Sequence, residues 1–256
     1  MSTPRWIRWL APAAVAFVAI LAWSAASARI SPVLLPSPLA VAEAVGSHGG
    51  TLAAATLTTG ASAFLGLVVA SLLGIGGALV FQRSAIAERA LYPYALFLQT
   101  LPVVAIAPLL VVWLGYGPPV AIGSAALVSF FPVLTSAHAG LAAADPDQVA
   151  LMRLYRSSWW QEMRLLRVPG SLPYLFSGLR TAAGLSTIGA IVGEFVGSNG
   201  FPACLGYLVL KGMRAAETGL IFAAIGCAAL LATAFFISVR TLGTRLVGRW
   251  HPGGSA

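Results

Sequence analysis

The sequence is poor in charged side chains, which make up 9% of its 256 residues and include one lysine and seven acidic residues. Hydrophobic residues make up 59%, and the mean hydropathy is +0.89. Soluble domains are roughly 45–50% apolar. A soluble globular domain is therefore excluded, and we predict an integral membrane protein.

Several kinds of site are excluded because their residue types are scarce. The single lysine, Lys211, is followed by glycine and methionine, so the chain has no Gly-Lys-Ser/Thr loop to bind ATP. The two cysteines, Cys204 and Cys227, form neither a C-x-x-C pair nor a metal-ligand spacing, which favours a packing role. The three histidines are widely separated. We predict no catalytic residue, metal site or bound cofactor in this chain.

The apolar residues fall into windows of helical length without a ten-residue alternating pattern, which predicts an all-α membrane bundle and not a barrel. We expect six transmembrane helices, at residues 9–26, 51–81, 92–114, 120–137, 172–195 and 220–239. Residues 1–50 are expected to form the first helix and an external loop, 51–240 the core domain, and 241–256 a basic cytoplasmic tail.

The first window also fits a cleaved signal peptide, because Arg5 and Arg8 precede it and a small-residue sequence, Ala-Ser-Ala, follows it. We expect a retained helix, since the window approaches bilayer length and the rest of the chain is itself apolar.

Glycine and proline residues within and between the apolar windows predict close packing, loops and kinks. In the second window Gly66, Ala70 and Gly74 recur every four residues, a small-residue ridge that permits close helix packing. Prolines at 32, 36 and 38 predict a loop over residues 29–50. The third window contains Pro102 and Pro108 and is expected to be kinked, and the fourth to be broken near its internal proline at 132.

Basic residues are distributed unevenly between the segments that join these windows. With both termini cytoplasmic, the internal segments hold eleven arginines and the external segments three basic residues. This excess is the positive-inside pattern of a multi-pass protein in a lipid bilayer. It also accounts for the net charge of +8 without a nucleic-acid partner.

Residues 144–173, which we call the polar loop, are the one long charged run. Asp145, with proline after it and Gln148 three residues on, is typical of a helix N-terminus, and Ser158 with Gln161 repeats the capping-box pattern. We therefore predict two short helices joined by a turn at residues 156–158. The second should run to about Arg167, before the Pro-Gly pair at 169–170.

The second short helix is expected to be amphipathic. At helical spacing one side carries Trp159, Met163 and Leu166, and another carries Trp160, Arg164 and Arg167. Two interpretations remain open: a helix that anchors at the lipid headgroups, and a knob for a soluble protein partner.

In the second half of the polar loop and across most of the chain, the sequence resembles a known family. The carrying segments are Leu166-Arg167-Val168-Pro169 followed by Ser171 to Arg180, Leu35-Pro36-Ser37-Pro38, Ala107-Pro108-Leu109, Trp113 to Gly117, Gly193-Glu194-Phe195 and Leu205-Gly206-Tyr207-Leu208. In order and spacing these are similar to the permease subunits of ABC-type importers, and closest to the sulfonate, nitrate and taurine branch. The polar loop resembles that family's EAA loop.

The resemblance implies a type I importer in a bacterial cytoplasmic membrane. Two permease copies, expected as a homodimer, would form the pathway; two cytoplasmic ATPases would bind ATP and Mg; and an external binding protein would deliver the solute. Related permeases carry sulfonates, taurine, nitrate, bicarbonate, pyrimidines or riboflavin, which implies a small anionic or heteroaromatic solute. The residues expected to dock the ATPase are Arg153, Arg156, Ser157, Ser158, Trp159, Trp160, Met163, Arg164 and Arg167.

The first half of the loop departs from the family pattern. Ala150, Met152 and Arg156 stand where the family has a glutamate, an alanine and the glycine of the turn. Because arginine tolerates a left-handed turn less well than glycine, the docking geometry is expected to differ here.

Residues expected to line the pathway are Gln99, Pro102, Pro108, Ser186 and Glu194. Ser186 and Glu194 belong to a ridge that recurs every four residues from Gly178, and the alternative is a packing face whose acid reaches the outer interface. There are two alternative classes of function. An ATP-independent secondary transporter or channel is disfavoured by the few intramembrane charges, and a membrane enzyme by the lack of a catalytic cluster.

Overall fold

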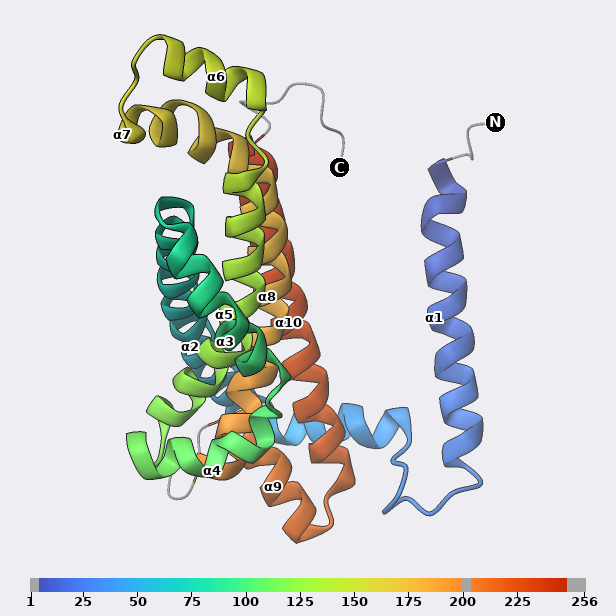
Figure 1. Cartoon of the computed structure of the whole chain (residues 1–256). Helices are drawn as coiled ribbons and strands as arrows, with labels where there is room; N and C mark the ends of the chain where they lie inside the picture. The colour runs from blue at the N-terminus through green and yellow to red at the C-terminus, as the bar shows by residue number, and fades with distance from the viewer. Residues whose placement is uncertain (1–4, 199–203, 248–256) are drawn as a thin grey trace.

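The chain folds almost entirely into helices in its computed structural model, which describes residues 5–198 and 204–247 (Figure 1). No strand occurs in these two ranges, so the predicted all-α fold is confirmed. In chain order the elements are α1 (Arg5–Ser27), α2 (Pro38–Arg83), α3 (Ala85–Thr100), α4 (Val103–Leu114), α5 (Pro118–Ala142), α6 (Pro146–Leu154), α7 (Trp159–Glu162), the π-helical turn η1 (Met163–Arg167), α8 (Val168–Gly197), α9 (Leu205–Ala215) and α10 (Thr218–Val247).

Helices α2, α5 and α10, and the continuous helix formed by α7, η1 and α8, are long and apolar enough to cross a membrane. The pair α3 and α4 makes a fifth candidate span that bends by 103° at residues 101–102. This bend confirms the predicted kink at Pro102. The expected count of six is not confirmed, because the part of α1 that qualifies as apolar, Ala13–Ser27, is shorter than a span.

Two of the predicted breaks between or within helices are wrong. Helix α2 takes in residues 38–50, which were predicted to be a loop, because Pro38 occupies the first helical position and the Ser37 hydroxyl caps the helix by accepting from the Ala40 N–H at 3.1 Å. Helix α5 continues through Pro132. A buried bundle helix tolerates proline because neighbouring helices compensate for the freed backbone groups.

The bundle is formed by α2, α5, α8 and α10, and the polar loop lies at one end, which we call the loop end (Figure 1). Helix α1 stands apart and meets the rest near its own C-terminus. There the Trp23 ring stacks on Phe222 at 5.9 Å, and its Nε1 donates to the Pro36 carbonyl at 3.0 Å.

Small residues allow the central helices to approach closely. A Cβ atom added at Gly66 would lie 2.5 Å from that of Ala125, and one at Gly74 would lie 3.0 Å from the Val133 side chain. Ala70 between them is fully buried. The predicted ridge on α2 is thus confirmed, and it packs against α5.

A pair of alanine substitutions in α8 tests this close packing. A Cβ at Gly178 would lie 2.4 Å from the Ser136 Cβ and 2.7 Å from the Pro132 carbonyl oxygen, whereas a Cβ at Gly184 meets nothing within 4 Å. We expect Gly178→Ala to lower the free energy of unfolding by about 1–3 kcal/mol through overpacking. Gly184→Ala should raise it by about 0.5–1 kcal/mol because the helix loses a flexible glycine. Thermal unfolding in detergent measures both, and equal effects would contradict the packing.

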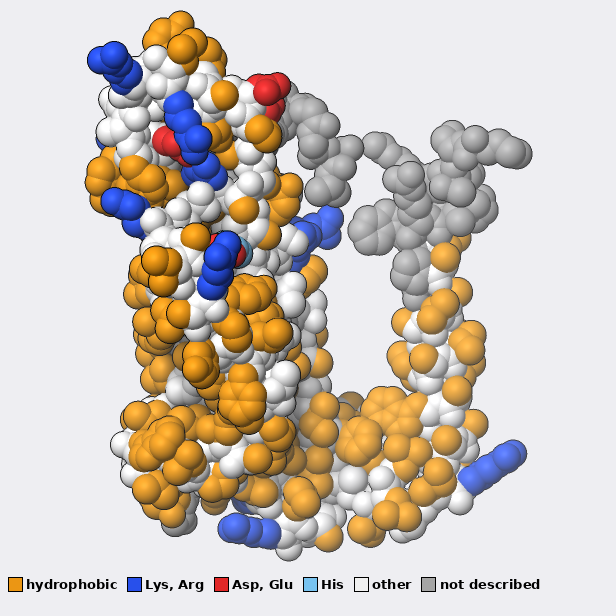
Figure 2. All heavy atoms as spheres, viewed as in Figure 1, with side chains coloured by type: hydrophobic (Ala, Val, Ile, Leu, Met, Phe, Trp, Pro, Cys, Tyr) orange, Lys and Arg blue, Asp and Glu red, His pale blue; other side chains and the backbone are white. Residues whose placement is uncertain are grey.

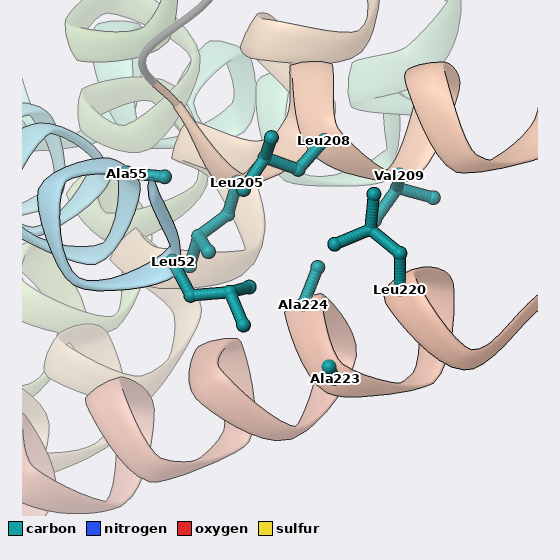
Figure 3. Packing of buried hydrophobic residues seen from close by; sticks show 8 residues of the cluster. All are labelled: Leu52, Ala55, Leu205, Leu208, Val209, Leu220, Ala223 and Ala224. Carbon is teal, nitrogen blue, oxygen red and sulfur yellow. The ribbon is translucent and has the colours of Figure 1, made fainter. Parts of the chain in front are cut away.

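At the opposite end of the bundle, α9 packs into a second core. Leu205, Leu208 and Val209 of α9 lie against Leu52 of α2 and Leu220 of α10 (Figure 3). This helix falls in a segment that was expected only to be external. The two cysteines form no disulfide, and Cys204 is buried beside this core while Cys227 packs against it.

Candidate functional site

The polar loop begins with the expected helix caps. Asp145 Oδ1 accepts from the Asp147 N–H at 2.9 Å at the start of α6, and Pro146 occupies the first helical position. At α7 the capping box is complete: the Ser158 hydroxyl accepts from the Gln161 N–H at 3.3 Å, and the Gln161 side chain accepts from the Ser158 N–H at 2.7 Å. The loop is therefore an ordered pair of capped helices.

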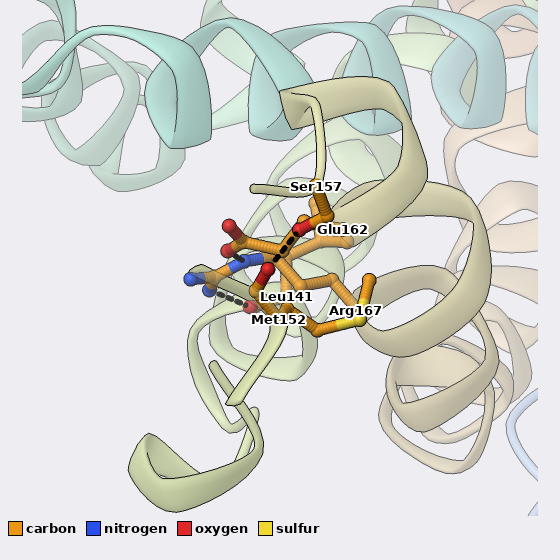
Figure 4. A network of polar contacts seen from close by, with 5 residues as sticks. All are labelled: Leu141, Met152, Ser157, Glu162 and Arg167. Carbon is orange, nitrogen blue, oxygen red and sulfur yellow. Dashed lines mark hydrogen bonds and ion pairs between the residues drawn. The ribbon is translucent and has the colours of Figure 1, made fainter. Parts of the chain in front are cut away.

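The turn between α6 and α7 is a Schellman motif. The Ser157 N–H donates to the Met152 carbonyl at 3.0 Å, and the Arg156 N–H donates to the Arg153 carbonyl at 2.9 Å. Figure 4 shows the third contact, in which the Ser157 hydroxyl donates to the Met152 carbonyl at 2.7 Å. Arg156 has φ 52, in the left-handed region. The predicted turn is confirmed, and an arginine holds the position that favours glycine.

Replacing Arg156 by glycine should stabilise the loop. An L-residue in the left-handed conformation costs about 1–2 kcal/mol, which glycine avoids. Glycine is also more flexible in the unfolded chain, and this offsets about 0.4–1 kcal/mol of the stability gained. We expect Arg156→Gly to slow amide hydrogen exchange in residues 146–158. Arg153→Gly, inside α6, should speed it. Faster exchange in Arg156→Gly would contradict the assigned turn.

The second short helix does not end at residues 169–170, contrary to expectation. It continues through η1 into α8 as a single helix. Pro169 cannot donate a backbone hydrogen bond, and in a regular α-helix its ring would meet the carbonyl of residue 165. The wider π turn relieves this conflict: the Val168 N–H donates to the Met163 carbonyl, five residues back.

Several large apolar side chains of the loop are exposed. On α6, Leu151, Leu154 and Tyr155 share one side at i, i+3 and i+4, and the last two are 79% and 78% exposed. Trp160 on α7 is 75% exposed. Sequence reasoning missed the three α6 residues, although their spacing on a capped helix was a usable signal.

The expected docking set does not lie on one exposed surface. Trp160 and three arginines are exposed: Arg153, Arg156 and Arg164. Ser157 and Ser158 instead hold the turn and the cap.

Trp159 is half-buried, with the Arg83 guanidinium 5.9 Å above its ring.

Met163 and Arg167, which are also expected to dock the ATPase, do not belong to the exposed surface. Met163 is 2% exposed and packs into the chain's own core with Phe81 and Leu141. The Arg167 side chain is 13% exposed and is bonded within the chain. Met163 follows Trp159 by one α-helical turn, and both pack against the same core. Arg167 lies at the end of the π turn, where α-helical spacing no longer applies.

The expected pathway residues are not brought together. Gln99, Pro102 and Pro108 lie on the exposed surface of the bent pair α3 and α4. Ser186 is fully buried in α8, where its hydroxyl donates to the Ala183 carbonyl at 2.9 Å.

Glu194 is 5% exposed and reaches neither the surface nor the other four residues of the expected set. Its Oε2 accepts from the Thr59 hydroxyl at 3.0 Å and from the Gly206 N–H at 2.9 Å, and Thr59 in turn accepts from the Leu205 N–H at 3.0 Å. The carboxyl thus joins α8 to α2 and to the start of α9. Just beside it, burial raises the pKa of the Cys204 thiol to about 12.

A polar contact that the sequence did not reveal lies near the loop end. His138 Nε2 of α5 is 3.1 Å from Glu88 Oε1 of α3, and the imidazole meets the rings of Phe81 and Tyr92 edge-on or tilted. Residues 88 and 138 are too far apart in the sequence for spacing to have indicated this pair.

The charged side chains visible in Figure 2 gather around the polar loop and at the far end, and a hydrophobic band lies between them. This arrangement is typical of a multi-pass membrane protein with a polar knob at one end. Within the described residues no cluster of three or more His, Cys, Asp or Glu side chains could hold a metal ion.

Comparison with known proteins agrees with this architecture. A probable ABC transporter permease protein of Haemophilus influenzae is 32% identical over 243 residues, covering 94% of this chain and 98% of the relative. The taurine transport system permease protein TauC of Escherichia coli is 28% identical over 240 residues, covering 90% and 85%. The resemblance to the sulfonate, nitrate and taurine branch is confirmed.

Among solved structures, the crystal structure of an amino acid ABC transporter with histidines matches with a TM-score of 0.61 at 18% identity, covering 80% of this chain and 96% of that one. This likeness confirms the permease fold. Residues 64–250 match the family model described as the binding-protein-dependent transport system inner membrane component. The chain therefore belongs to the binding-protein-dependent family of ABC importer permeases.

Proposed function

We propose that this chain forms the translocation pathway of an ATP-driven importer and that its polar loop docks a cytoplasmic ATPase. The observation that carries the proposal is the loop itself, because two capped helices project beyond the hydrophobic band and expose Leu154, Tyr155 and Trp160. Exposed aromatic and aliphatic groups with arginines nearby are the composition of protein interfaces, where aromatics and arginine are enriched.

ATP and Mg belong to the partner in this proposal. The chain has no phosphate-binding loop of its own, as Lys211 is its only lysine and is followed by glycine and methionine. Closure of the ATPase pair would move the docked loop, and α7 would pass the motion directly to α8, since the two are one continuous helix.

The remaining partners follow from the same proposal. A second copy of the chain completes the pathway as a homodimer, an external binding protein delivers a small anionic or heteroaromatic solute, and both termini lie in the cytoplasm. The bent pair α3 and α4 suits a pathway role in this proposal, because Gln99 is exposed and the break before Pro102 leaves polar backbone groups that lipid would not satisfy.

Purification of the tagged chain with the proteins that accompany it tests this function. We expect a complex that contains an ABC ATPase and hydrolyses ATP, and solute uptake in cells that stops when ATP is depleted. The ligand carried by the co-purified binding protein identifies the solute class. Uptake that continues without ATP would instead support a secondary transporter or channel.

A further inference from the structure

The π turn brings together two charged residues that α-helical spacing keeps apart. Arg167 Nε donates to Glu162 Oε1 at 2.6 Å, across five residues, and both side chains are nearly buried at 13% and 14% exposure. In an α-helix, residues three and four apart are neighbours. The i→i+5 geometry of η1 therefore creates this ion pair.

Arg167 makes a second contact, to a different helix. Its Nη1 donates to the Leu141 carbonyl at 2.9 Å (Figure 4). Leu141 is the second-last residue of α5, so its carbonyl is one of the last four, which have no partner within the helix. A cation at this negative end of the helix dipole is stabilising.

Arg167 is the last residue of η1, directly before α8, and its guanidinium thus makes charge-assisted hydrogen bonds to α7 through Glu162 and to the end of α5 through Leu141. Within the described ranges the only other close contact between an acidic side chain and a basic or histidine side chain is the one between Glu88 and His138. We call these contacts of Arg167 with Glu162 and Leu141 the joint. The joint lies where the polar loop enters the bundle, between the exposed loop residues and the helices that α8 packs against.

We propose that Glu162 and Arg167 form a strut that keeps the entry of α8 rigid, so that motion of the docked loop moves α5 and α8 together. This inference rests on the proposed function. Arg167 is then a positioning residue that transmits force, and it takes no part in the docking surface. Without the strut the loop would still bind the ATPase, but the loop would move relative to α5 and α8, and less of its motion would reach them.

Reciprocity between coupled sites supplies the readout. If the external binding protein acts on the ATPases through this joint, then weakening the joint lowers the stimulation of ATP hydrolysis by the binding protein. The purified complex is assayed for ATP hydrolysis with MgATP, with and without the co-purified binding protein, and the ratio of the two rates is the coupling. The variants are Arg167→Gln, Glu162→Gln and the reversed pair, Glu162→Arg with Arg167→Glu.

We expect each single variant to retain the ATPase on purification and to reduce the coupling ratio at least about fivefold. The reversed pair should restore about half of the ratio or more, because it re-forms the ion pair while losing the bond to Leu141. Arg89→Gln is the matched control, because Arg89 is an exposed arginine of α3 with no side-chain hydrogen bond or ion pair recorded among the described residues, and it should leave the ratio unchanged.

Two results would overturn the strut: an unchanged ratio in both single variants, or a loss in the single variants that the reversed pair does not restore. Loss of the ATPase from the single variants would assign the pair to docking and would also overturn it. Failure of the unsubstituted chain to retain an ATPase would instead refute the proposed function itself.

Discussion

The double variant Tyr155→Ala with Trp160→Ala should lose the ATPase on purification and abolish ATP-driven uptake. Both side chains are more than 70% exposed and belong to opposite sides of the Schellman turn. Aromatic residues at the centre of an interface cost at least about 2 kcal/mol each on truncation. Their combined loss would weaken docking by about a thousandfold, since every 1.4 kcal/mol is about tenfold.

The matched control removes two exposed aromatics from the other end of the bundle. Trp113 and Tyr116, at the junction of α4 and α5, are 66% and 54% exposed. Trp113→Ala with Tyr116→Ala deletes similar groups far from the loop and should retain the ATPase. Equal loss in both double variants would show that general stability, and not docking, explains the result.

The second large effect is expected at Glu194. Replacing it by alanine leaves the Thr59 hydroxyl and the Gly206 N–H without their buried acceptor. A buried donor left without an acceptor costs about 1–3 kcal/mol, so Glu194→Ala should lower the free energy of unfolding by about 2–5 kcal/mol. Glu194→Gln keeps a carbonyl oxygen for both donors and should lose about 1 kcal/mol.

Thermal unfolding in detergent measures the global loss, and amide hydrogen exchange localises it. We expect exchange in α9 to rise strongly in Glu194→Ala and weakly in Glu194→Gln, because the carboxyl holds the start of this helix. A Glu194→Ala variant with the stability of the unsubstituted chain would contradict the structural role. If it stayed folded but bound no solute, a pathway role would be supported instead.

Local signals in the sequence predicted local structure well. Asp145 and Ser158 were expected to cap the two loop helices, and their side chains do so. The turn at Arg156 and the bend before Pro102 also follow from short-range backbone rules that need no knowledge of neighbours. These features depend on three or four consecutive residues, which is the range at which sequence patterns are informative.

Contacts between distant elements were not predictable in the same way. Glu194 is bonded to Thr59, 135 residues away, and nothing in the spacing of either residue indicates the other. The position of Arg167 departs from expectation for a more local reason. Pro169 predicted a helix end, whereas the chain widens into a π turn at residues 163–167 and continues, which changes the phase of the residues beyond it.

The measurement that most directly tests docking by the polar loop is site-specific photocrosslinking in intact cells. A benzophenone amino acid is placed at Trp160, with a second variant carrying it at Phe97, an exposed apolar residue of α3 within the hydrophobic part of the bundle. We predict that position 160 crosslinks to a protein whose sequence contains a Gly-Lys-Ser/Thr phosphate-binding loop, and that position 97 does not. Crosslinking of position 160 to lipid alone would show that the loop anchors at the membrane surface, and would contradict the account.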